Sequence, residues 1–163
     1  MILIFPEPFR VKNPTLDVQN SYMISSVINE IEMRGIGRFV EVNALQESDY
    51  VQEIHRIIAK EKPDWVIASG ESATACIHLH KQKKILINPV VTFHDLNHVP
   101  EYASRHTYGF FGAKPGQKKS YELFQTVYPH SAWHFNTSDL QPADIKDITI
   151  TIINSEAKQR AKQ

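Results

Sequence analysis

The chain has 163 residues with 18 basic and 18 acidic side chains, so its formal net charge is +0. A single domain of this length buries a core without disulfides or metals, and the charge balance argues against a nucleic-acid binder, which usually carries a basic excess. The single cysteine, Cys76, is typical of a reducing compartment. Because no apolar run approaches the roughly 20 residues of a membrane span and no basic leader precedes the first apolar run, we expect a cytoplasmic protein without a membrane partner.

The first half of the chain alternates between short apolar runs and amphipathic segments. Residues 2–5 form a continuous apolar run, which is typical of a strand buried on both faces. Residues 17–34 carry apolar side chains at helical spacing, and residues 38–42 predict a second strand. Ser48 is a candidate N-cap for a helix that extends to about Lys60, and residues 64–68 predict a third strand.

The same alternation continues in the second half. We expect strands at 84–87, 107–111 and 132–135, and helices at 72–80, at 120–128 and from Pro142 onward. Residues 92–106 are predicted to be irregular or weakly helical. This pattern predicts an α/β three-layer sandwich with a mostly parallel sheet of about six strands in the order 2-1-3-4-5-6. We assign residues 1–155 to this single domain and residues 156–163 to a polar tail.

One segment between a predicted strand and a predicted helix resembles a catalytic motif. Gly70-Glu71-Ser72-Ala73-Thr74 is similar to the nucleophile elbow G-x-S-x-G, in which a sharp turn presents a serine hydroxyl above a parallel sheet. Ser72 is then the candidate nucleophile, and the backbone N–H of Ala73 is the candidate oxyanion donor. Thr74 replaces the last glycine, and a simple helix-capping role for this segment stays equally open.

Three stretches of the chain resemble one family. They are residues 63–72, residues 84–90 with Asn88-Pro89 after a strand, and residues 107–112 with their continuation toward residue 153. The chain resembles here the small YqiA-like bacterial esterases of the α/β-hydrolase superfamily. The resemblance implies a minimal α/β-hydrolase-like core without a large lid, and a serine-dependent esterase site at the carboxyl ends of the strands.

The sequence departs from the family pattern at several catalytic positions. The stretch that should hold the acid, residues 112–116, has no carboxylate, and Ser138 stands where the histidine should be. The first strand ends in a proline-rich segment instead of His-Gly, and proline has no N–H to donate. The residues expected to line the site are Pro6, Glu71, Asn88, Ser138 and Asp139.

These departures favour a protein that does not catalyse. A serine is a weak nucleophile without a base in reach, and loss of triad members leaves only residual catalysis. We therefore expect a pseudo-hydrolase with a binding or regulatory role, with no cofactor or metal, whose partner is a small acyl compound or a protein. The alternative is a carboxyl-ester or thioester hydrolase that uses Ser72 with His94 as a relocated base, held by Asp95 or Asp139.

The remaining histidines have simpler interpretations. His94 and His98 are spaced like two metal ligands on a helix, but the sequence offers no third ligand. His78 and His80 are two residues apart on the predicted helix, so we expect them on different faces and partly exposed. We expect His134 to pack within a strand.

Three further features are expected to be structural. Cys76 is predicted to be a buried, unreactive thiol. Trp65 and Trp133 are predicted to pack in strands. The basic tract from Lys81 to Lys84 is predicted to be a solvated turn between a helix and a strand.

Overall fold

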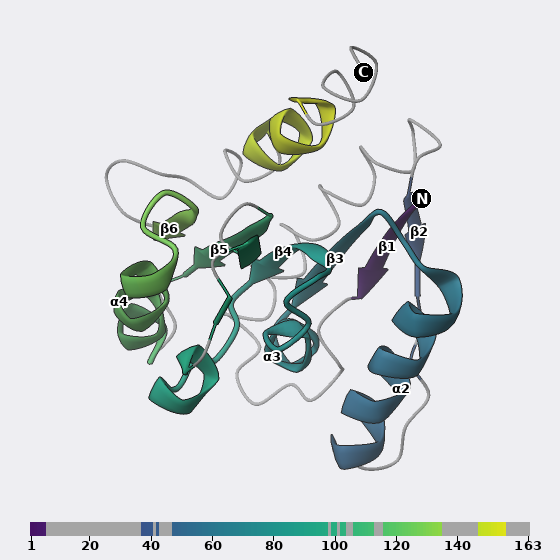
Figure 1. Ribbon diagram of the computed structural model, residues 1–163, viewed down its shortest axis with the longest axis horizontal. Helices are drawn as coiled ribbons and strands as arrows, with labels where there is room; N and C mark the ends of the chain where they lie inside the picture. Colours follow the sequence, from purple (N-terminus) through teal and green to yellow (C-terminus); the bar gives the residue numbers. More distant parts are fainter. Residues whose placement is uncertain are drawn as a thin grey trace.

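The computed structural model describes residues 1–5, 37–40, 42, 47–97, 99–100, 102–103, 106–112, 116–134 and 147–155. Within these ranges the protein has an α/β fold with a parallel sheet, as the alternating pattern predicts (Figure 1). The strands are β1 Ile2–Phe5, β2 Gly37–Phe39, β3 Trp65–Ser69, β4 Lys83–Ile87, β5 Thr107–Phe111 and β6 Ala132–His134. The helical elements are α2 Glu47–Glu61, α3 Glu71–Cys76, the 3-10 turn η1 Phe93–Leu96, α4 Gln117–Val127 and the helix of residues 147–155.

The strands lie in the order β2-β1-β3-β4-β5-β6, and every neighbouring pair is parallel. After β1 the chain adds β2 on one side and then crosses back to place β3 on the other side. Strand order therefore reverses beside β1, and the carboxyl ends of β1 and β3 flank the reversal. Open parallel sheets bind ligands at such a point, and α3 begins there.

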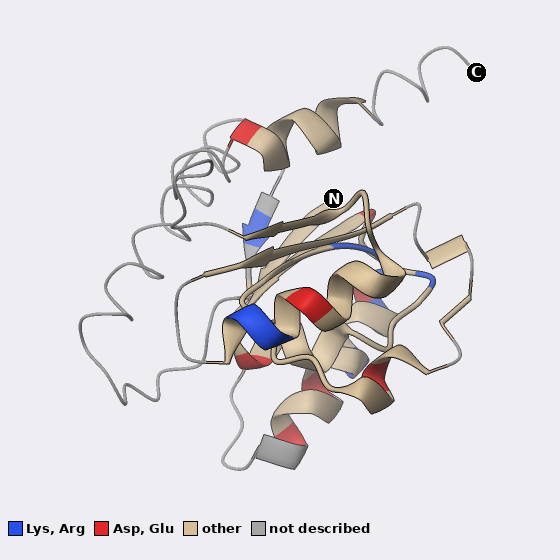
Figure 2. Cartoon of the chain, turned by 90° about the vertical axis from the view of Figure 1, so that its left-hand side faces the viewer, with Lys and Arg blue, Asp and Glu red and all other residues tan. Residues whose placement is uncertain are grey.

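Alternate residues of the strands face two separate layers. Leu3, Val66 and Leu86 belong to the cluster that packs under α2, α3 and α4. Ile4, Ile67 and Ile85 belong to the opposite cluster, which includes Ile148 and Ile152 from the helix of residues 147–155. Figure 2 shows the sheet nearly edge-on, with the three helices on one side and the C-terminal helix on the other. No helix in the described ranges is long and apolar enough to cross a bilayer.

Several element boundaries differ from those expected. The second strand spans Gly37–Phe39 rather than residues 38–42, and its last pair with β1 is Ile4–Phe39. Ser48 lies inside α2, which begins one residue earlier at Glu47. The predicted helix at 17–34, the start of the last helix at Pro142 and the tail at 156–163 lie outside the described residues.

The helix after β3 is shorter than predicted and ends at Cys76 instead of about His80. The Nζ atom of Lys84 accounts for the next turn, since it donates hydrogen bonds to the carbonyl oxygens of Leu79 at 2.8 Å and Gln82 at 3.3 Å. These carbonyl groups converge on an ammonium group, which fixes the chain in a compact turn before β4.

Candidate functional site at the turn between β3 and α3

The sharp turn after β3 lies at Gly70. This residue has φ 60° and ψ −127°, a combination that side chains with a Cβ rarely adopt. Its N–H donates to the carbonyl of Ile87 at 2.9 Å, and its carbonyl accepts from the N–H of Thr74 at 3.1 Å. Gly70 thereby joins the end of the sheet to the first turn of α3. The position that a nucleophile elbow gives to its reactive side chain is thus held by a glycine.

Ser72 lies two residues further on, inside the first turn of α3. It is 0% exposed, and its hydroxyl oxygen is 2.5 Å from the hydroxyl oxygen of Tyr50 on α2. Ser72 therefore faces the contact between two helices. Because Ser72 has no exposed surface, an ester cannot reach its hydroxyl in this structure.

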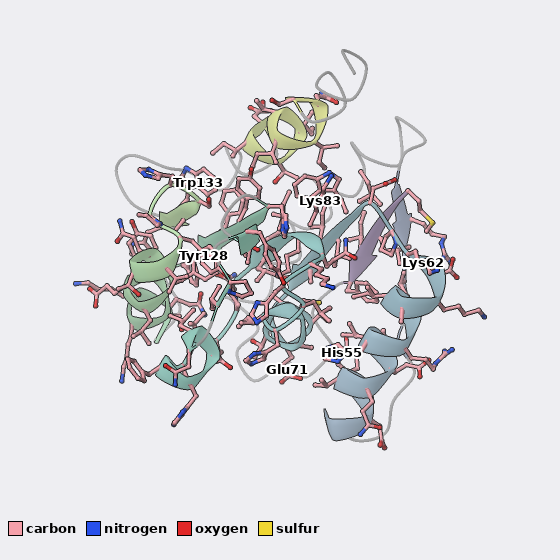
Figure 3. The ribbon with its side chains drawn as sticks, in the orientation of Figure 1. His55, Lys62, Glu71, Lys83, Tyr128 and Trp133 are labelled. Carbon is pink, nitrogen blue, oxygen red and sulfur yellow. The ribbon has the colours of Figure 1, made fainter. Side chains whose placement is uncertain are left out.

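The neighbours of Ser72 divide between surface and core. Glu71 is exposed and projects from the start of α3 (Figure 3), where its charge complements the positive end of the helix. Ala73, the expected oxyanion donor, has a fully buried side chain. The residue that directly follows the turn is Glu71, so the N–H in the position of an oxyanion donor belongs to Glu71 and not to Ala73.

Asn88 at the end of β4 has a structural role. It is buried and adopts φ 54°, which asparagine tolerates better than most residues. Its N–H donates to the carbonyl of Phe110 at 2.7 Å, and its Oδ1 accepts from the N–H of Gly112 at 2.7 Å. Asn88 thus fastens the end of β4 to the end of β5, and this explains the Asn-Pro sequence without catalysis.

His94 and Ser72 have different surroundings. His94 is exposed on η1, which packs against α4, whereas Ser72 faces α2. The acid expected beside His94, Asp95, instead accepts a hydrogen bond from Nε2 of His78 at 2.8 Å. Burial tends to raise the pKa of Asp95, but hydrogen bonds from Thr92 and His78 outweigh it and lower the pKa below its ordinary value.

The other histidines fit structural roles. His134 stacks on Tyr121 with ring centroids 5.4 Å apart, which supports the expected packing role. His78 is exposed and His80 is half-buried, as expected, but their rings are 6.3 Å apart. The expectation that they lie on different helix faces is wrong, because both follow the end of α3. The described residues contain no group of three or more potential metal ligands, and His98 lies outside them.

Cys76 and the two tryptophans are packed as expected, whereas the basic tract of residues 81–84 is not. Cys76 is buried, and burial raises the pKa of its thiol to about 12, which makes it unreactive at neutral pH. Trp65 is buried in β3, and Trp133 stacks on Phe110 at 4.9 Å. The tract of residues 81–84 is only partly solvated, because Lys84 is 0% exposed.

Sequence reasoning missed three features of this region: the Tyr50–Ser72 contact, the His78–Asp95 pair and the buried Lys84. The sequence did contain a signal for the burial of Lys84, because the alternation of side chains in β4 places residue 84 on the same face as the core residue Leu86. The expected lining residues Pro6, Ser138 and Asp139 lie outside the described residues.

No protein-family model matches the chain, and no curated protein matches it.

Proposed function

We propose that this chain is an α/β-hydrolase-like protein of the YqiA-like esterase type that has lost catalysis and works by binding a small acyl compound or a protein. The proposal includes a minimal hydrolase-like core without a large lid. One observation carries it: the residue at the sharp turn between β3 and α3 is Gly70, with φ 60°. A glycine has no hydroxyl with which to attack an ester carbonyl.

The surroundings of the turn support the same conclusion. Ser72 is completely buried against Tyr50, so its hydroxyl belongs to the packing of α2 on α3. The sequence also lacks a carboxylate at residues 112–116 and has Ser138 where the resemblance requires a histidine. Nucleophile, base and acid act as a unit in serine hydrolases, and the loss of any one member removes most of the rate.

The binding role is supported by the loop that follows β4. Val90 is 58% exposed and Phe93 is 70% exposed, and both lie beyond the carboxyl end of β4. Ligands of open parallel sheets bind at this edge. We place the protein in the cytoplasm, because its single cysteine is a buried thiol that takes no part in a disulfide.

A fluorophosphonate probe tests the loss of catalysis. We expect the folded wild-type protein to remain unlabelled and to hydrolyse p-nitrophenyl butyrate at the same background rate as the Ser72→Ala variant. An active serine esterase in a parallel reaction shows that the probe is competent. Labelling at Ser72, together with saturable turnover that the Ser72→Ala variant lacks, would overturn the proposal and establish the esterase alternative.

A further inference from the structure

A pocket of about 610 Å³ lies between the second half of α2 and the turn of residues 78–82. This turn joins the end of α3 to the start of β4, so the pocket lies toward the amino ends of the strands, whereas Gly70 lies at the carboxyl end of β3. Figure 3 shows His55, one of the lining residues, on the side of α2 that faces α3. The pocket is therefore a different site from the turn at Gly70.

Much of the pocket wall is apolar. Ile58 and Ala59 contribute from α2, Leu79 contributes from the turn, and the partly exposed ring of Tyr102 adds an aromatic surface. A volume of this size, with hydrocarbon walls and a few polar groups, is typical of small-molecule sites. These walls suit a ligand with an aliphatic or aromatic body.

Most polar side chains of the wall carry nitrogen atoms, and none is an acid. The lining residues of the described chain include His80 and Lys81 but neither Asp nor Glu. Lys81 is exposed, so its ammonium group is accessible to a ligand. The Nδ1 atom of His80 is buried and has no hydrogen-bond partner within the described residues. Native structures rarely leave such an atom unpaired, and a ligand can supply its partner once the half-buried ring of His80 turns to expose it.

The other two imidazole groups of the wall already have partners. Nε2 of His55 lies 2.6 Å from the carbonyl oxygen of Ala75, and Nε2 of His78 lies 2.8 Å from a carboxylate oxygen of Asp95. Both partner atoms accept only, so each of these nitrogen atoms carries the hydrogen. The amide nitrogen of Gln82 donates to backbone carbonyl groups. Among the nitrogen-bearing side chains of the wall, His80 and Lys81 therefore remain to contact a ligand.

A buried positive charge lies behind the turn. Lys84 is 0% exposed, and its Nζ donates to two carbonyl oxygens of the turn and to the Thr107 hydroxyl at 3.1 Å, all of them neutral. Burial lowers the pKa of His80, and the nearby Lys84 ammonium lowers it further. This charge favours an anion in the pocket and works against the opposing charge of the Asp95 carboxylate, which is hydrogen-bonded to His78.

We propose that this pocket binds a small organic anion, a monocarboxylate with an apolar chain or ring. The apolar body packs against Ile58 and Leu79, and the carboxylate faces Lys81 and His80. This proposal does not depend on whether the turn at Gly70 is catalytic. Either result of the fluorophosphonate experiment therefore leaves it unaffected.

Calorimetric titration with three matched ligands tests the proposal. We expect octanoate to bind with one-to-one stoichiometry, octylammonium not to bind, and octanol to bind about tenfold or more weakly, because it lacks the charge-assisted hydrogen bonds. Equal affinity for octanoate and octanol, preference for octylammonium, or no binding of octanoate would each overturn the proposal.

Two exposed positions provide variants that preserve the fold. Ala59→Glu adds a carboxylate to the wall, and Gln52→Glu adds the same charge to an exposed position of α2 that does not line the pocket. We expect the first to abolish octanoate binding and the second to leave it unchanged.

Lys81→Met, with Lys118→Met on α4 as its control, is expected to weaken octanoate binding about tenfold. Amide chemical shifts should move at residues 55–59 and 78–82. Octanoate binding that is unaffected by both pocket variants, or shifts confined to other residues, would contradict the site.

Discussion

The hydroxyl groups of Tyr50 and Ser72 lie 2.5 Å apart across the contact between α2 and α3. Burial raises the pKa of Tyr50, so its phenol stays protonated at neutral pH and one hydroxyl donates to the other. The serine that the sequence marks as a nucleophile therefore helps to hold two helices together.

A double-mutant cycle measures this contact. Tyr50→Phe, Ser72→Ala and the double variant should each be less stable than the wild type, with a coupling energy of about 1 kcal/mol. Urea unfolding followed by circular dichroism gives the four free energies of unfolding, one for the wild type and one for each variant. Strictly additive effects of the two single changes would show that the hydroxyl groups do not interact.

Replacement of Gly70 should be costly because of its backbone angles. We expect Gly70→Asn to destabilise the protein by about 1–3 kcal/mol. Gly116→Asn is the matched control, since Gly116 also has positive φ but lies in the left-handed region, which asparagine tolerates, and has open space around it. The control should lose little stability in the same urea experiment. Equal losses at the two positions would contradict the assignment of the strained turn to Gly70.

Lys84 should make stability depend on alkaline pH. Burial lowers its pKa in the folded state to about 8, against 10.5 for an ordinary lysine. Between these values the unfolded chain binds more protons than the folded one, so the free energy of unfolding rises with pH. The penalty of burying the charge is fully present below pH 8 and is relieved as the pH approaches 10.5.

Urea unfolding at two pH values checks this dependence. Between pH ~7.5 and ~9.5 we expect the titration of Lys84 alone to raise the free energy of unfolding by about 2 kcal/mol. The Lys84→Met variant lacks the titrating group, so its free energy of unfolding should lack this component. Identical pH slopes for wild type and variant would show that Lys84 is not buried as a charged group.

Gly109 in β5 lies where a larger residue does not fit. A Cβ atom at this position would lie 2.8 Å from a ring atom of Phe111 and 2.8 Å from a ring atom of Phe124. Both rings are buried and pack with centroids 5.2 Å apart, so neither yields easily. We expect Gly109→Ala to lower the free energy of unfolding by about 1–3 kcal/mol. A thermal midpoint equal to that of the wild type would contradict this packing.

The fold class was predictable because its signal is repeated along the chain. Short apolar runs such as residues 2–5 and 107–111 alternate with amphipathic segments, and the structure has strands over these same residues. A parallel sheet follows from such alternation, since parallel strands need crossover connections. The ends of elements were less predictable. The turn that follows the early end of α3 at Cys76 is held by the ammonium group of Lys84, which comes from the next strand.

The position of the turn after β3 was not predictable from the motif. Ala68, Ser69 and Gly70 are all small, so the sequence does not define the residue at which the strand ends. A shift of two residues exchanges a serine for a glycine at the turn. The φ angle of Gly70 decides between them, and one of the hydrogen bonds that hold this turn is made to Ile87, which is distant in the sequence.

Three side chains tie the loop after β4 to neighbouring helices. The hydroxyl of Thr74 accepts from the N–H of Val90, the hydroxyl of Ser120 accepts from the N–H of Val91, and the amide of Gln117 donates to the carbonyl of Pro89. A molecule that docks on this rim meets a backbone that is already pre-organised, so association forfeits little conformational entropy there. We therefore expect a partner to associate rapidly with this rim and to cause little movement of its backbone.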